Sequence, residues 1–143
     1  MNSSLYGTGI DIVDKRRISQ LYHSDRVDFF LQKWFNEYEI DVINSDMNPE
    51  NVLALFFGIK EAFIKASNGI VRLKDFKSIK IHKNKIGYSI KYTRDSFLIN
   101  RKIDINYIDY IHHVIVSVII FEKNQEMKYV HNLLRQEIKN VFL

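Results

Sequence analysis

The sequence contains no cysteine, one proline and five glycines in 143 residues. Without cysteine, the chain has no thiolate nucleophile and no zinc–cysteine site, and its composition fits a reducing compartment. We find no flexible linker, low-complexity tract or internal repeat. The length is that of one ordinary domain, and a hydrophobic fraction of 46% is sufficient for a single core without disulfides.

Long hydrophobic runs are also missing. The longest candidate, residues 114–121, has the length of a strand, whereas a membrane helix needs about 18 apolar residues. The first residues show no positively charged leader before an apolar segment, so we expect no secretory signal, no membrane contact and a cytoplasmic protein.

The net charge of +4 is mild. It is weaker than that of a typical nucleic-acid-binding domain, and the chain lacks a stripe of Arg and Lys with interleaved aromatic residues. We therefore expect no nucleic-acid partner. A charge of this sign and size suits an acidic protein partner or a polyphosphate ligand.

The first third of the chain predicts one strand and then short helices. Small and apolar residues alternate over 5–13, which is the pattern of a strand. Asp14 is a suitable N-cap for a helix directly after this strand, and a second helix is predicted over 24–34. Asn36 and Glu39 have the spacing of a capping box at the start of a third.

A long central helix is the clearest element of the sequence. Asn48 is a suitable N-cap, Pro49 occupies the first helical position, and Gly69 marks the end. Apolar residues cover most of the circumference between these signals, so we expect this helix to be buried.

The second half of the chain predicts strands. Alternating or continuous apolar patterns indicate four of them, over 76–82, 86–92, 102–107 and 114–121, the last covered on both faces. Because the helices and strands are segregated, the fold class is α+β with an antiparallel sheet packed on the central helix. Helical spacing then predicts an amphipathic C-terminal extension over 123–143, after a domain over 1–122.

Residues 7–13 read Gly-Thr-Gly-Ile-Asp-Ile-Val, which places Asp11 in an otherwise apolar strand. A buried lone carboxylate is costly, so such a residue needs a cation or hydrogen bonds. The alternative is a carboxylate at the strand end that accepts backbone hydrogen bonds or faces solvent.

Residues 57–66 read Phe-Gly-Ile-Lys-Glu-Ala-Phe-Ile-Lys-Ala, and Glu61 and Lys65 share one face of the predicted helix. They form either an ordinary exposed ion pair or a polar stripe that faces a ligand. Together with Asp11 they supply two carboxylates and an ammonium group. Mg²⁺ prefers such oxygen ligands and completes its shell with water and substrate phosphates, while a lysine neutralises a phosphate as a point charge.

At this point the sequence resembles the holo-acyl-carrier-protein synthases, a group of 4′-phosphopantetheinyl transferases. Residues 7–13, followed by Arg17 and Ile18, look like the opening motif of that family. Residues 34–40 are similar to its Phe-Thr-x-x-Glu segment, and residues 57–66 are close to its long-helix motif. The resemblance covers roughly residues 5–122.

The resemblance implies a reaction and a fold. The family transfers 4′-phosphopantetheine from coenzyme A to a serine of an acyl carrier protein and releases adenosine 3′,5′-bisphosphate. Its members are small α+β domains, usually homotrimers with active sites at subunit interfaces. The resemblance therefore implies a Mg²⁺-dependent transferase of fatty acid or related biosynthesis, with coenzyme A as a substrate.

The resemblance also implies roles for particular residues. Asp11 and Glu61 match the metal-binding acids, and Glu61 and Lys65 match catalytic positions. A nearby acid or a water on the metal would accept the proton of the serine, and Glu61 fits either route. Contacts to coenzyme A are implied for Lys60, Lys65 and Gly69.

The first predicted helix carries the expected partner site. Arg16 and Arg17 match the basic helix that meets the acidic carrier protein.

Two positions depart from the family pattern. Phe56 stands where the family usually has an Arg, and Tyr110 stands where it has a His, with His112 and His113 shortly after. Both changes affect the handling of coenzyme A more than the metal site. They support an alternative interpretation, a catalytically weak or inactive relative that binds a carrier protein or stabilises a complex.

Overall fold

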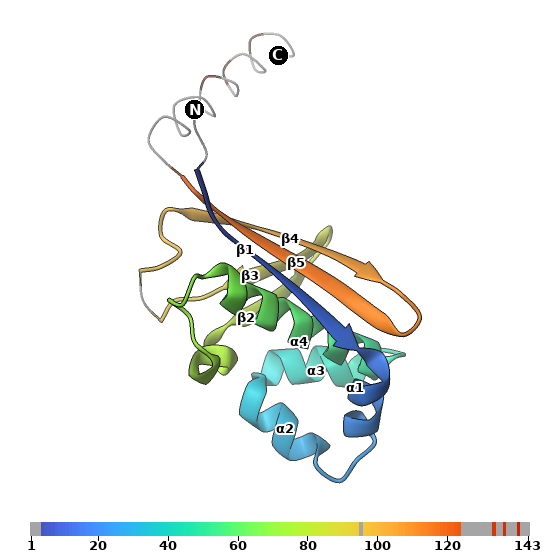
Figure 1. The fold of residues 1–143 in the computed structure, drawn as a ribbon. Helices are drawn as coiled ribbons and strands as arrows, with labels where there is room; N and C mark the ends of the chain where they lie inside the picture. Colours follow the sequence, from blue (N-terminus) through green and yellow to red (C-terminus); the bar gives the residue numbers. More distant parts are fainter. Residues whose placement is uncertain (1–3, 95, 124–132, 134–135, 137–139, 141–143) are drawn as a thin grey trace.

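The computed structural model describes residues 4–94 and 96–123, and positions 133, 136 and 140. The chain begins with strand β1 (Ser4–Asp14). Four helices follow it (Figure 1): α1 (Lys15–Tyr22), α2 (Val27–Trp34), α3 (Glu37–Ser45) and the long helix α4 (Pro49–Ala66). Within the described residues, none of the helices combines the length and the hydropathy needed to cross a membrane.

The second half contains a 3₁₀ helix, η1 (Leu73–Ser78), and four strands: β2 (Lys80–Asn84), β3 (Gly87–Lys91), β4 (Arg101–Asp109) and β5 (His113–Glu122). Strands β1, β5 and β4 form an antiparallel sheet in that order, and β2 and β3 form a separate hairpin. Helix α4 lies across one face of the larger sheet, with the hairpin beside it (Figure 1). The predicted α+β class and the packing of an antiparallel sheet on the central helix are confirmed.

The two faces of the larger sheet differ in burial. On β5, alternate side chains from Val114 to Ile120 face α4 and are almost completely buried. The intervening side chains are only half-buried, so the prediction that this strand is covered on both faces holds for one face only. On β1, Ile10 and Ile12 are 59% and 62% exposed. A bulge between Leu5 and Gly7 interrupts the pairing of β1 with β5 before these residues.

Strand β1 and helix α4 approach each other at two glycines. A Cβ atom added to Gly7 would lie 2.1 Å from the carbonyl oxygen of Ala66. One added to Gly9 would lie 2.0 Å from the carbonyl oxygen of Ala62. Neither backbone oxygen can move aside, so the strand reaches the helix only with glycine at both positions.

Lys60 lies in the core of the molecule. Its ammonium group is 2.8 Å from Glu39 Oε1 and donates to the carbonyl oxygen of Trp34 at 3.1 Å, and both charged side chains are fully buried. Glu39 accepts the backbone N–H of Asn36 on the same oxygen and that of Ile81 on the other. Burial lowers the pKa of Lys60, and the charge of Glu39 opposes this effect.

The resemblance implies a coenzyme A contact for Lys60, and the structure contradicts it. The side chain has no exposed surface, and its ammonium group has carboxylate and carbonyl partners. A buried ion pair that loses one partner leaves an uncompensated charge in the core, so Lys60 is not available to a ligand.

The local signals at helix starts are confirmed in two places. Asp14 accepts the backbone N–H of Arg16 as the N-cap of α1, and this hydrogen bond lowers the pKa of Asp14. Asn36 and Glu39 form the predicted capping box of α3. Asn48 precedes α4, but its side chain makes no capping hydrogen bond.

Two predictions about the second half of the chain were not confirmed. The strand predicted from residue 76 begins at Lys80, because the residues before it form the 3₁₀ helix η1. The predicted C-terminal helical extension over 123–143 falls almost wholly outside the described residues.

Candidate active site

Asp11 on β1 and Glu61 on α4 lie close enough to influence each other. Burial raises the pKa of Glu61, the negative charge of Asp11 raises it further, and the charge of Lys65 partly offsets both effects. Asp11 faces α4 because it shares the inner face of β1 with Gly7 and Gly9. The close contact of the two backbones therefore brings the two carboxylates together.

Lys65 joins this pair of acids from the next turn of α4. Its ammonium group donates to the carbonyl oxygen of Ile10 at 3.0 Å and to Asp11 Oδ1 at 3.1 Å. The Lys65 side chain is 51% exposed, whereas that of Asp11 is 14% exposed. The site is thus a recessed carboxylate pair with a flexible cation at its rim.

The chemistry of these donors fits a magnesium ion. Mg²⁺ is commonly held by one or two carboxylates, and water and substrate phosphates complete its octahedral shell. Burial is the main cause of the raised pKa of Glu61, and a divalent cation would relieve the repulsion from Asp11 that adds to it. Among the residues that the structure describes, no group of three or more His, Asp or Glu side chains could hold a metal ion, so Asp11 and Glu61 would need ligands from water or substrate.

Apart from the buried Lys60, the other predicted site residues lie on the surface. Gly69 lies three residues after the end of α4, has a φ of +89° in the left-handed region that glycine adopts easily, and is exposed. Arg16 and Arg17 are exposed in the first turn of α1, which directly follows the strand that carries Asp11.

The two positions that depart from the family pattern have different surroundings. Phe56 is fully buried, and its ring meets the edge of the Tyr88 ring at a centroid distance of 5.5 Å. Tyr110 is 52% exposed in the turn between β4 and β5. Phe56 is therefore a core residue here, and no cationic group replaces it at that point of α4.

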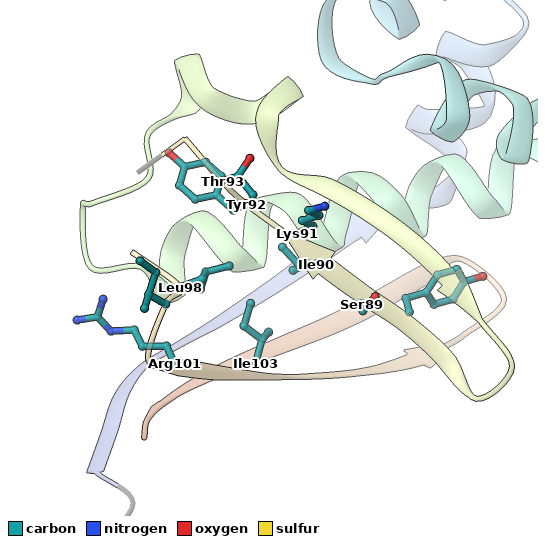
Figure 2. Close-up of a pocket in the computed structure, with 10 residues that line it drawn as sticks. Ser89, Ile90, Lys91, Tyr92, Thr93, Leu98, Arg101 and Ile103 are labelled. Carbon is teal, nitrogen blue, oxygen red and sulfur yellow. The ribbon is translucent and has the colours of Figure 1, made fainter. Parts of the chain in front are cut away.

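A cavity of about 590 Å³ lies away from the carboxylates, between β3 and the start of β4 (Figure 2). Its lining includes Tyr92, Leu98 and Arg101 but none of the three charged site residues. The guanidinium of Arg101 lies over the ring of Phe97, donates to the carbonyl oxygen of Phe97 and pairs with Glu122. Since neither Asp11 nor Glu61 lines this cavity, it is not the place where a diphosphate meets the carboxylates.

Comparison with known proteins decides the family. The family model described as the 4′-phosphopantetheinyl transferase superfamily matches residues 7–119. The chain belongs to this superfamily. The matched segment contains Asp11, Glu61 and Lys65, and it ends before the C-terminal residues outside the described part.

One relative with a known name agrees with this family assignment. The chain is 39% identical to the holo-[acyl-carrier-protein] synthase of Clostridium perfringens over 84 residues. This alignment covers 58% of this chain and 61% of that protein. The match therefore spans about three fifths of the curated relative.

Solved structures cover the fold more fully. The holo-[acyl-carrier-protein] synthase of Neisseria meningitidis matches with a TM-score of 0.71 and 27% identity, over 84% of this chain and all of that one. The synthase of Bacillus anthracis, solved in complex with coenzyme A, matches with a TM-score of 0.68 and 18% identity, over 85% of this chain and all of that one.

Sequence reasoning missed two features near the site. The spacing of Asn36 and Glu39 predicted a capping box at the start of α3. Nothing in that spacing indicated that the carboxylate of Glu39 also pairs with Lys60. The ion pair between Lys65 and Asp11 was also not predicted, because the two residues are 54 positions apart.

The raised pKa of Glu61 gives a pH-dependent stability. Because the folded state holds the proton more tightly than the unfolded state, ionised Glu61 destabilises the fold above the ordinary value of 4.5. Below that value both states are protonated, and this cost is absent. We expect E61Q to raise the Tm of the metal-free protein at pH 7, with a gain that shrinks toward pH 4.

Thermal denaturation in the presence of EDTA measures this difference. The matched control is E37Q, because Glu37 is exposed on α3 and is not one of the carboxylates of the site. A Tm for E61Q at or below that of the unmodified protein at pH 7 would show that Glu61 is not destabilised by its surroundings.

Proposed function

We propose that this chain transfers 4′-phosphopantetheine from coenzyme A to a serine of an acyl carrier protein in a Mg²⁺-dependent reaction. The observation that carries the proposal is the convergence of Asp11 and Glu61 across the contact between β1 and α4, with Lys65 at the rim. A recessed anionic pair beside an exposed cation suits a metal-bound diphosphate, which is the reacting group of coenzyme A.

The relatives support the same reaction. The Clostridium perfringens protein is named a holo-[acyl-carrier-protein] synthase, and the Bacillus anthracis structure contains coenzyme A. The match to the family model runs from residue 7 to residue 119, so it includes the strand and the helix that carry the carboxylates.

The roles of the residues follow from their charge and position. Asp11 and Glu61 would hold Mg²⁺, which when bound supplies charge neutralisation for the diphosphate oxygens. Lys65 presents its ammonium group to a phosphate from the solvent side. We assign the acceptance of the serine proton to Glu61 or to a water beside it, because Glu61 is one of the two carboxylates of the site. Gly69, three residues after α4, offers open space to the ligand, because no atom beyond its chain neighbours lies within 4 Å of where its Cβ would be.

Transfer is measured as the mass gain of an apo acyl carrier protein incubated with coenzyme A, Mg²⁺ and the enzyme. We expect the unmodified protein to modify the carrier and E61Q to lose at least about 100-fold in rate, since a metal ligand and a base are removed together. E37Q, whose carboxylate is exposed on α3, is expected to retain full activity. If E61Q is as active as E37Q, Glu61 is not part of the active site.

A second candidate function is carrier-protein binding without transfer. It is supported by Phe56, which is buried against Tyr88 where the family usually has an Arg. In the same assay, several carrier proteins that bind but gain no mass would favour this function over catalysis.

The carrier protein is expected to dock on α1. Arg16 and Arg17 are exposed there, and α1 begins four residues after Asp11, so a docked carrier would present its serine near the carboxylates. We expect R17E to weaken the binding of the carrier about tenfold, because a positive contact becomes repulsive. The KM for coenzyme A should stay unchanged.

The control for this prediction is K85E, which makes the same charge reversal at the exposed turn between β2 and β3. Titration of each variant with the carrier protein separates the two sites. An R17E variant that binds the carrier normally but coenzyme A poorly would remove Arg17 from the docking surface.

We also infer that three copies of this chain associate through the outer face of the larger sheet. Ile10 and Ile12 on β1 and Ile108 on β4 are each more than half exposed on that face, and the side chains of β5 between them are half-buried. Contiguous exposed apolar surface of this kind marks association sites. Ile10 and Ile12 are the sequence neighbours of Asp11 but point to the opposite face of β1, so this subunit contact would lie on the other side of the strand from the carboxylates.

Multi-angle light scattering after gel filtration tests this inference. We expect a mass three times that of the 17.1 kDa chain, and a lower mass for I12K, because a charge would be buried between subunits. A monomeric unmodified protein at micromolar concentration would contradict the inference.

A further inference from the structure

We propose that Lys65 is an exchangeable counter-cation, which pairs with Asp11 until a divalent ion binds and then turns to a phosphate of the substrate. This inference rests on the metal site of the proposed function. It concerns which cation neutralises Asp11 at each stage, and it assigns Lys65 a place in metal binding as well as in phosphate binding.

The contacts of Asp11 are the first support. Within the described ranges, its only ion pair is the one with Lys65, at 3.1 Å. The ammonium group that makes this pair also donates to the carbonyl oxygen of Ile10, so it lies directly against β1. A metal ion that binds Asp11 must therefore approach a carboxylate oxygen that already has a cationic partner.

The unequal exposure of the partners allows the exchange. Asp11 is 14% exposed and belongs to a paired strand, opposite Val116 of β5, so its carboxylate is held in place. The long side chain of Lys65 is 51% exposed, so its ammonium group can swing from the ion pair into solvent. The lysine can leave the pair without disturbing the strand, whereas the aspartate cannot follow it.

The charges of the site favour a change of partner. Asp11, Glu61 and Lys65 together carry one net negative charge, and a bound Mg²⁺ would turn this into one net positive charge. Lys65 would then be repelled by the ion that shares Asp11. The phosphates of a bound substrate offer the lysine a new anionic partner on the exposed side, so metal and substrate binding assist each other.

Lys60 shows what a fixed lysine looks like on the same helix. It has no exposed surface, and it is held by Glu39 and by the carbonyl oxygen of Trp34. Removal of that lysine would leave a buried charge, whereas removal of Lys65 exposes Asp11 to a competing cation. The two lysines, five positions apart on α4, therefore have opposite roles.

The alternative role for Lys65 is a permanent bridge between α4 and β1. In that case its loss would loosen the strand and weaken the binding of a divalent ion. The two roles predict effects of opposite sign, so one titration distinguishes them.

The experiment titrates the full-length protein with Mn²⁺ in the absence of nucleotide and follows free Mn²⁺ by electron paramagnetic resonance. We expect K65M to bind Mn²⁺ about threefold to tenfold more tightly than the unmodified protein, because an exposed ion pair no longer competes and a nearby positive charge is removed. K65R keeps the charge and should not bind more tightly. K65Q provides a second neutral variant if K65M does not fold.

The matched control is K15M. Lys15 also pairs with an aspartate, Asp109, but the pair lies between α1 and the end of β4. This variant should bind Mn²⁺ as the unmodified protein does. A second titration with adenosine 3′,5′-bisphosphate and saturating Mn²⁺ should show weaker nucleotide binding for K65M, because the lysine is then missing from the phosphate.

The outcomes separate this inference from the proposed function. If Mn²⁺ binds and D11N abolishes that binding, but K65M binds it no more tightly than the unmodified protein, the exchange is overturned and the metal site remains. If D11N and E61Q bind Mn²⁺ as well as the unmodified protein does, the metal site itself is wrong. Tighter Mn²⁺ binding by K65M, with weaker nucleotide binding, supports the exchange.

Discussion

The close contact between β1 and α4 is the constraint on which the candidate site depends. It exists because Gly7 and Gly9 place no side chain between the strand and the carbonyl oxygens of α4. Asp11 follows these glycines on the inner face of the strand. On the helix, Glu61 and Lys65 each directly precede one of the two alanines whose carbonyl oxygens the strand approaches. A wider separation of the two elements would leave two unrelated acids, one on a strand and one on a helix. The shared backbone contact makes them one site.

Helix α4 is held from its other side by the buried pair of Lys60 and Glu39. This pair connects the helix to the start of α3 and to β2, because Glu39 accepts backbone hydrogen bonds from both. Consecutive residues of the helix thus point to different environments. Lys60 fixes the helix in the core, while Glu61 faces the strand. A charged residue next to a site is therefore not a ligand by default, and its exposure and partners decide its role.

Local signals in the sequence predicted much of this arrangement. The capping residues Asp14 and Asn36 act through neighbours within three positions, so spacing alone identified them. The family motifs indicated that Asp11 and Glu61 belong to one metal site, which stays a prediction; in the structure, burial and then the negative charge of Asp11 raise the pKa of Glu61. Lys60 was assigned wrongly, because its partner is 21 positions away and a buried lysine is rare. The 3₁₀ helix η1 was missed because alternation over a few residues does not distinguish it from a strand.

The bulge between Leu5 and Gly7 has a consequence for how the N-terminal segment can change in length. Side chains of a strand alternate between faces, so a shift of one residue would bring an isoleucine to the carboxylate site and send Asp11 to the outer face. A bulge absorbs an extra residue without shifting the pairing beyond it. Insertions or deletions before Gly7 are therefore compatible with the site. A single insertion or deletion between Gly7 and Asp14 would move Asp11 away from the site, so that stretch must keep its length.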